Sequence, residues 1–169
     1  MKELLLIRHA KSDWDHPGLT DHDRPLNARG LRDAPAMAAA LKQRGVRPDR
    51  IVSSTAVRAM MTAKRLAGGM DYPEERILRK PELYLAPPAI LLGLVQQLDE
   101  EADTAMIIGH NPGMHEASAA LSPEGGLDGF PTLAVARFEI AADYWGLVEW
   151  GSARLIEFLT PRSLGGGAV

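Results

Sequence analysis

The chain contains no cysteine among its 169 residues. This absence excludes disulfide bonds, thiolate zinc sites, iron–sulfur clusters and any cysteine nucleophile. An excess of positive charge is also missing: 19 Lys and Arg against 22 Asp and Glu give a net charge of −3, which argues against broad nucleic-acid binding. The longest apolar runs, Leu4–Ile7 and Ala89–Val95, are far too short to span a bilayer. We therefore expect a cytoplasmic protein with no signal peptide, no membrane contact and no nucleic-acid partner.

The overall composition is that of an ordinary soluble globular protein, with 46% hydrophobic and 24% charged residues. A chain of this length suits one domain and leaves little room for a second. We expect a single domain over residues 1–160. A flexible tail over 161–169, which contains three consecutive glycines, should follow it.

The first part of the chain reads as a buried strand, a long loop and a helix. The apolar run Leu4–Ile7 is typical of a strand buried on both faces. The polar stretch 11–26 is too long for an idle connector, which predicts a functional loop or a lid. Asn27 should then cap a helix that ends near Gly45, with Pro35 expected to kink it.

Strands and helices continue to alternate up to about residue 120. Strands are expected at 51–52, 77–78 and 104–108, and helices after a cap at Ser54 or Thr55, from 87–88 and from Pro112. Beyond Thr132 the apolar pattern changes to period two, which predicts strands at 132–140, 144–150 and 154–159, with the first two as a candidate hairpin. The pattern indicates an α/β fold with a largely parallel sheet, extended by C-terminal strands of which some are antiparallel.

Charged and potentially catalytic side chains follow the predicted strands. Arg8 and His9 come directly after the first strand, Arg58 lies in the first turn after the second, Glu82 follows the third, and His110 ends the fourth. Ligands of open α/β sheets bind outside the carboxyl ends of parallel strands, so we expect these side chains to converge. Guanidinium groups present paired donors that match phosphate oxygens, and an imidazole beside a phosphoryl group can attack phosphorus. The pattern therefore predicts a phosphate site.

Four segments resemble those of the histidine phosphatase (phosphoglycerate mutase-like) superfamily. Arg8-His9-Ala10 is similar to its Arg-His-Gly motif, with Ala10 as a departure, and 25–30 is similar to the helix start that follows this motif. Segment 52–63 resembles the Ser-x-x-x-Arg-x-x-x-Thr-Ala segment, and 107–112 resembles the second histidine motif. The match covers residues 2–120 in order, and the short length together with segment 8–14 points to the SixA-like phosphohistidine phosphatase branch.

The resemblance implies a fold and a mechanism. The fold would be a three-layer α/β/α sandwich. His9 would be the nucleophile that becomes phosphorylated, while Arg8, Arg58 and His110 would bind the phosphoryl oxygens and stabilise the transition state. The enzyme would be a metal-independent phosphatase without a cofactor, acting on a phosphorylated substrate that is either a protein phosphohistidine or a small phosphate ester.

Two further roles are carried by the resemblance or by position. Glu82 falls where the family often has its proton donor, although a leaving imidazole needs less acid help than an alcohol does. Ser12 is a candidate phosphate contact from the loop. Substrate specificity should depend on rim residues such as Trp14, His16 and Tyr84, and no sequence feature indicates an oligomeric state.

Several alternatives stay open at this point. Segments 13–16 and 21–23 contain aspartates and histidines that could bind a metal, although a solvated acidic loop is the favoured interpretation. If those aspartates converge in the fold, the protein would be a metal-dependent phosphatase. A phosphoglycerate-mutase-type enzyme is disfavoured because such relatives are longer, and a non-catalytic phosphate-binding protein is disfavoured because all five strand-end positions are filled.

Overall fold

The computed structural model describes residues 1–165 and contains a central six-stranded sheet in the order β3-β2-β4-β1-β5-β6. The strands are β1 (Lys2–Arg8), β2 (Arg50–Ser53), β3 (Leu78–Arg79), β4 (Thr104–Gly109), β5 (Val135–Ile140) and β6 (Ala153–Leu159). The first four are parallel, whereas β5 pairs antiparallel with both β1 and β6. The prediction of a largely parallel sheet with antiparallel C-terminal strands is confirmed.

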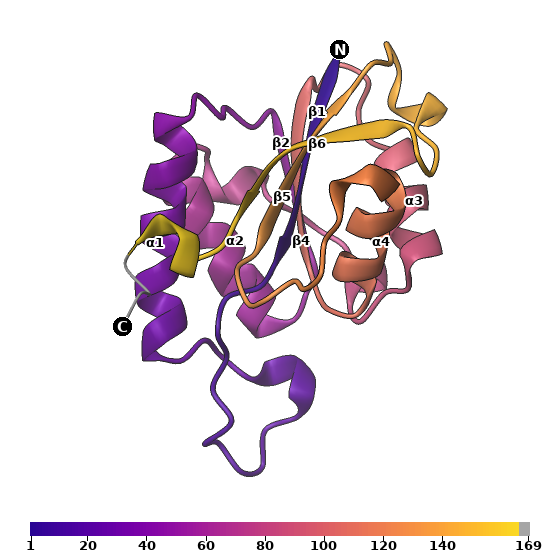
Figure 1. Cartoon of the computed structure of the whole chain (residues 1–169). Coiled ribbons are helices and arrows are strands. Elements are labelled where there is room, and N and C mark those ends of the chain that lie inside the picture. Colours follow the sequence, from indigo (N-terminus) through magenta and orange to yellow (C-terminus); the bar gives the residue numbers. More distant parts are fainter. Residues whose placement is uncertain (166–169) are drawn as a thin grey trace.

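Helices cover both faces of this sheet (Figure 1), which confirms the three-layer arrangement. The helices are α1 (Ala28–Gln43), α2 (Val57–Gly69), α3 (Pro88–Gln96) and α4 (Gly113–Leu121). The first two pack on one face and the last two on the other. As predicted, Asn27 caps α1, because its side chain accepts a hydrogen bond of 2.9 Å from the Gly30 backbone N–H. The helix continues through the exposed Pro35.

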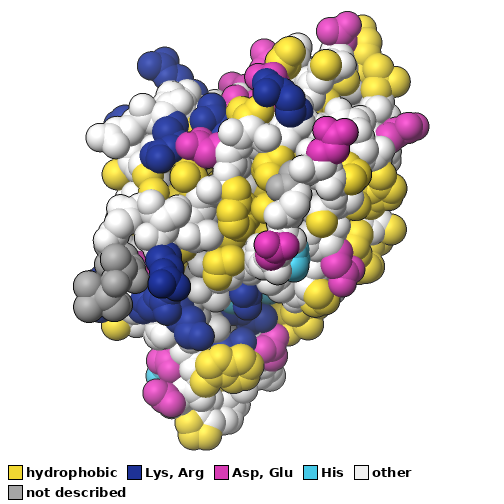
Figure 2. Space-filling view, in the orientation of Figure 1, with side chains coloured by type: hydrophobic (Ala, Val, Ile, Leu, Met, Phe, Trp, Pro, Cys, Tyr) yellow, Lys and Arg dark blue, Asp and Glu magenta, His cyan; other side chains and the backbone are white. Residues whose placement is uncertain are grey.

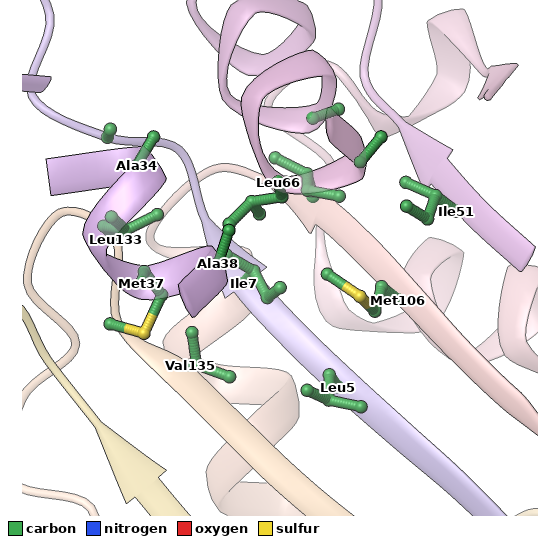
Figure 3. Close-up of a cluster of buried hydrophobic side chains, with 14 of the residues drawn as sticks. Leu5, Ile7, Ala34, Met37, Ala38, Ile51, Leu66, Met106, Leu133 and Val135 are labelled. Carbon is green, nitrogen blue, oxygen red and sulfur yellow. The ribbon is translucent and has the colours of Figure 1, made fainter. Parts of the chain in front are cut away.

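The apolar run of β1 explains why the core has two halves. Successive side chains of a strand point to opposite faces, so Leu5 and Ile7 pack against α1 and α2, while Leu4 and Leu6 pack against α3 and α4. All four side chains are fully buried. Figure 3 shows Leu5 and Ile7 within the first half of the core, beside Met106 of β4. A strand buried on both faces was the prediction for this segment, and the structure confirms it.

The predicted strand over 144–150 is wrong, and so is the hairpin it was to form. The segment contains a short 3₁₀ helix, Trp145–Leu147, and β5 pairs with β6 instead. Trp145 is fully buried, with its indole N–H donating to the Ala102 carbonyl at 2.8 Å and its backbone N–H donating to the Glu100 carboxylate at 2.9 Å. The apolar pattern came from Trp145 and Val148, which are both fully buried around this 3₁₀ helix, and not from a sheet ladder.

Two helix starts and one strand start differ slightly from the predictions. The N-cap of α2 is Ala56, not Ser54 or Thr55, and no side chain caps this helix. Helix α4 begins at Gly113, one residue after the predicted Pro112, and β5 begins at Val135. Such shifts of one to three residues leave the strand ends, and hence the side chains that follow them, where the pattern predicted.

The C-terminal segment is partly folded. Arg162–Leu164 forms a 3₁₀ helix, and Leu164 packs against the half of the core that lies under α1 and α2. Part of the tail predicted over 161–169 thus contacts the domain, and residues 166–169 lie outside the described residues. None of the helices within residues 1–165 combines the length and the apolar character that a membrane crossing requires.

Candidate active site

A cleft of about 310 Å³ opens at the carboxyl edge of the parallel strands. In Figure 1 this edge faces the loop 11–26 at the lower end of the molecule, where Figure 2 shows Lys and Arg side chains gathered. The cleft brings together five of the six predicted site residues. Its lining residues are Arg8, His9, Lys11, Ser12, Trp14, Asp21, Arg24, Arg58, Leu85, His110, Asn111 and Thr132.

The lining divides into a buried floor and an exposed mouth. We call His9, Arg58 and His110 the floor, because they are only 6%, 3% and 3% exposed. We call Trp14, Asp21 and Leu85 the mouth, because the exposed fractions are 71% for Trp14 and 53% for Leu85, and 43% for the side chain of Asp21.

His9 follows the last residue of β1 and presents one ring nitrogen to the cleft. Its Nδ1 lies 2.7 Å from the Ala10 carbonyl oxygen, which can only accept, so Nδ1 carries the hydrogen and Nε2 keeps its lone pair. The Nε–H of Arg58 points at this Nε2 over 3.3 Å. Burial, together with the charges of Arg58, Arg8 and Arg24, lowers the pKa of His9 to about 4 in spite of the Ala10 hydrogen bond. The ring is therefore neutral at pH 7.

Arg58 is held from the opposite side by the loop. Its Nη1 donates to the backbone carbonyl of Asp21 at 2.6 Å and its Nη2 donates to the Asp21 carboxylate at 2.9 Å. All three guanidinium nitrogens thus have partners, and the planar group is fixed beside His9. The guanidinium has five N–H bonds and uses three of them in these contacts, so donors remain for an incoming anion.

Arg8, the last residue of β1, carries unused donor capacity. Its Nη1 donates to the Phe130 carbonyl at 3.1 Å, and Asn111 Nδ2 donates to the same carbonyl at 2.8 Å. Arg8 Nε and Asn111 Oδ1 are buried without a hydrogen-bond partner among residues 1–165. Burial lowers the pKa of Arg8, with the charge of Arg58 acting in the same direction, but a guanidinium stays cationic at neutral pH. An orphaned buried N–H of this kind fits a bound oxyanion.

His110 completes the floor opposite His9, with the two ring centroids 5.2 Å apart. Its Nε2 lies 2.8 Å from the Ser54 hydroxyl, and its buried Nδ1 has no partner within the described chain. Burial, together with His9 and Arg58, lowers the pKa of His110 to about 3, so this ring is also neutral at pH 7. If the Ser54 hydroxyl donates to Nε2, the hydrogen on Nδ1 is free for a ligand. Sequence reasoning placed Ser54 at a strand end but missed this contact.

Ser12 lines the cleft and is tied to a third arginine that sequence reasoning missed. Arg24 Nη1 donates to the Ser12 hydroxyl at 2.8 Å, and the Arg24 guanidinium carbon lies 3.4 Å from the centre of the Trp14 ring. Arg24 is 8% exposed, so most of its surface is covered by the loop that carries it. No periodic pattern marks a side chain that folds back within an irregular loop.

Asp21 is the other site residue that sequence reasoning missed, and Tyr84, expected at the rim, is its hydrogen-bond partner. The Asp21 carboxylate accepts from Arg58, from Arg24 Nε at 3.2 Å and from the Tyr84 hydroxyl. These hydrogen bonds, the one from Tyr84 first, hold the pKa of Asp21 well below its usual range. Segment 21–23 is largely exposed, as the interpretation of a solvated acidic loop expects, but Asp21 is in addition ion-paired with Arg58 and lines the cleft.

Glu82 does not belong to this cleft, contrary to expectation. It lies on the 3₁₀ helix Pro81–Leu83, where Leu83 is buried in the half of the core under α3 and α4. With Leu83 turned inward, the neighbouring Glu82 is exposed to solvent, and it is absent from the lining. Within residues 1–165, no three His, Asp or Glu side chains come together in a way that could bind a metal ion, so the loop aspartates do not converge.

Comparisons with known proteins agree with this geometry. Residues 4–83 match the model of the histidine phosphatase superfamily (branch 1). An uncharacterised protein of Mycobacterium tuberculosis is 32% identical over 165 residues, which cover 92% of this chain and 100% of that one. A structure from Agrobacterium tumefaciens, assigned as a candidate phosphohistidine phosphatase SixA, is 33% identical with a TM-score of 0.81, over 95% of this chain and 98% of that one. The chain belongs to the histidine phosphatase superfamily.

Within the superfamily the chain falls into the SixA-like branch and is a phosphatase. The structure of the protein histidine phosphatase SixA complexed with tungstate has the same fold, with a TM-score of 0.81 at 23% identity over 96% of this chain and 99% of that one. The match extends over nearly the whole length of both chains, so the α/β/α sandwich described above is the fold of this branch.

Proposed function

We propose that this phosphatase hydrolyses phosphohistidine through a covalent phosphohistidine intermediate on His9. The observation that carries the proposal is the state of the His9 ring. Its Nδ1–H is held by the Ala10 carbonyl, and its unprotonated Nε2 faces a cleft lined by two arginines of the strand ends. A neutral imidazole with a fixed tautomer is a nucleophile that is ready to attack phosphorus.

In the first step, the Nε2 lone pair of His9 forms a bond to phosphorus. The bond from phosphorus to the leaving nitrogen breaks, and its electron pair stays with that nitrogen. In the second step, water attacks phosphorus and the electron pair of the N–P bond returns to Nε2, which releases phosphate and a proton. The Nδ1–H bond to Ala10 persists throughout and stabilises the positive charge that the phosphorylated ring carries.

The remaining floor residues stabilise the phosphoryl group during both steps. Arg58 lies 3.3 Å from Nε2, and Arg8 has a buried Nε–H without a partner in the described chain. With the Ser54 hydroxyl donating to Nε2 of His110, the unpartnered Nδ1 carries the hydrogen and supplies a third donor. Enzymes accelerate phosphoryl transfer mainly by positioning the reactants and stabilising charge. Hydrogen-bond donors that are already in place therefore account for most of the rate enhancement.

The lack of an acid in the cleft favours phosphohistidine over an ester of an alcohol. An alkoxide leaving group needs a proton, but Glu82 is outside the cleft and Asp21 is ionised. A leaving imidazole can carry its proton on the far ring nitrogen and departs as a neutral molecule. The exposed mouth at Trp14 and Leu85 also leaves room for a histidine that protrudes from a protein surface.

The test is to trap the intermediate. Rapid quenching with ³²P-labelled substrate should leave label on the peptide that contains Arg8-His9-Ala10, labile to acid and stable to alkali, as a phosphoramidate is. His9→Ala should trap none, whereas His115→Ala, a change in a histidine of α4 outside the cleft lining, should trap as much as wild type. Label on His110, on a carboxylate or nowhere would refute the assignment of the nucleophile.

A substrate screen separates the alternatives. Phosphohistidine peptides, small phosphate esters and phosphoglycerates should be compared with EDTA present throughout. The proposal expects the highest kcat/KM for phosphohistidine and no loss in EDTA. Preference for a small ester, transfer between phosphoglycerates, or activity restored only by added Mg²⁺ would each point to one of the other enzyme classes.

A further inference from the structure

We propose that Asp21 selects the leaving group, because its carboxylate at the mouth of the cleft favours a departing group that carries positive charge before the bond breaks. A ring-protonated phosphohistidine is such a substrate, and an aryl or alkyl phosphate is not. This inference rests on the proposed reaction at His9 and concerns which state of the substrate the site accepts.

The direction of attack puts the leaving group beside Asp21. In phosphoryl transfer the attacking and leaving atoms are roughly in line through phosphorus. His9 is the attacking group and lies at the floor, where it is 6% exposed. The leaving atom must therefore point away from the floor and toward the mouth. Asp21 lines the cleft with a side chain that is 43% exposed, so its carboxylate lies on the outward side.

Asp21 is the only carboxylate among residues 1–165 that lines the cleft. The charged and titratable groups that face it are Arg24 from the same loop, Arg58 from α2, Tyr84 from the segment before α3, and His110 of the floor. Both arginines are buried behind the carboxylate, at 8% and 3% exposure, so the negative end of this cluster is its solvent-facing side. Held in this way, the carboxyl stays ionised and cannot donate a proton.

The chemistry of the phosphoramidate makes this charge useful. When the far nitrogen of the substrate ring is protonated, the ring is a cation. His9 Nε2 then forms its bond to phosphorus, the substrate P–N bond breaks, and its electron pair goes to the ring nitrogen. A neutral imidazole leaves, with its proton still on the far nitrogen. A nearby carboxylate favours binding of the cationic ring, whereas it opposes the negative charge that develops on a departing phenolate.

Asp21 also positions Arg58, and the two roles predict different results. Loss of positioning lowers kcat/KM by the same factor for every substrate, because the phosphoryl group is common to all of them. Loss of selection changes the ratio between a cationic and an anionic leaving group. The ratio is therefore the measurement that a purely structural role would not move.

The experiment compares imidazole phosphoramidate with an aryl phosphate whose phenolate has a basicity close to that of imidazole. For each substrate, kcat/KM reports the steps up to departure of the leaving group, so hydrolysis of the intermediate does not enter. Asp21→Asn keeps the shape and removes the charge, and it should lower the phosphoramidate-to-aryl ratio by about 1.5- to 5-fold, as expected for a partly exposed ion pair. Asp21→Glu should retain most of the ratio.

Asp23→Asn is the matched control, because it removes the same charge from the same loop at a side chain that is exposed and outside the cleft lining. It should leave the ratio near the wild-type value. An equal loss on both substrates in Asp21→Asn, including complete loss, would assign Asp21 to positioning alone and overturn the inference. Labelling of His9 in the same samples keeps the two proposals apart: with label on His9 and an unchanged ratio, only the role of Asp21 fails.

Discussion

The floor and the mouth of the cleft are built in different ways. Each floor residue follows the end of a parallel strand: His9 comes directly after β1, His110 directly after β4, and Arg58 in the first turn of α2, the helix after β2. The mouth residues Trp14 and Asp21 come from an irregular loop. The sheet thus fixes the groups that perform the transfer, while loops carry the groups that meet the rest of the substrate. Changes in the floor should therefore impair the reaction with every substrate, and changes in the mouth should mainly alter which substrates are accepted.

The largest effect of a single binding residue is expected for Arg58→Ala. The variant loses the guanidinium that lies beside Nε2 of His9, and removing one such donor typically lowers kcat by about 10²- to 10³-fold. Competitive inhibition by vanadate or phosphate should weaken in parallel. Arg65→Ala, a change further along the same helix and outside the cleft, is the control. Wild-type oxyanion affinity in Arg58→Ala would show that Arg58 does not bind the phosphoryl group.

The pH dependence tests the neutral state of the floor. Since burial lowers the pKa of His9 to about 4, Nε2 keeps its lone pair down to that pH and becomes protonated below it. Nucleophilic activity should fall about tenfold per pH unit below the pKa. An NMR titration of the His9 ring in the free enzyme measures the value directly, with circular dichroism to verify that the fold persists. A transition near the ordinary histidine pKa would mean that water reaches the His9 ring and that burial does not lower its pKa.

A smaller effect is expected at the mouth for Trp14→Ala. One face of the Trp14 indole covers the Arg24 guanidinium, whose central carbon lies 3.4 Å from the ring centre. The rest of Trp14 is exposed and can contact a protein substrate. Its loss should lower kcat/KM for a phosphorylated protein by about 2- to 5-fold, in line with a cation–π contact at an exposed site. The rate with imidazole phosphoramidate, which is too small to reach the outer rim, should stay the same. Equal losses on both substrates would place Trp14 in the chemistry.

The smallest effect is expected for Glu82→Gln. Glu82 is exposed on its 3₁₀ helix and outside the cleft lining, so kcat/KM should change by less than about twofold, as is usual for surface substitutions. The rates should be compared on aryl and alkyl phosphates. A loss that grows with the basicity of the leaving group would restore Glu82 as the proton donor and would require the segment before α3 to move in the complex.

The same contrast explains what the sequence could predict. Side chains next to a buried strand, such as His9 and His110, follow from the apolar pattern, because the strand end and the edge of the sheet are fixed together. The contacts of Asp21 and Arg24 depend on how an irregular loop folds back on α2, which no local periodicity encodes. The prediction that Glu82 reaches the cleft was wrong for a related reason, because burial of the adjacent Leu83 decides which side of the short helix faces the solvent.

The loop that supplies most of the mouth leaves and rejoins the domain at a single point. Ser12 and Leu26 form a backbone bridge, the Asp13 N–H donates to the Pro25 carbonyl at 2.8 Å, and the Asn27 N–H donates to the Lys11 carbonyl at 3.0 Å. A loop that is closed at its base gains or loses residues at little entropic cost. Segment 14–20 can therefore be exchanged for another length and sequence, which would change the substrates that the mouth accepts while Asp21 continues to hold Arg58 beside His9.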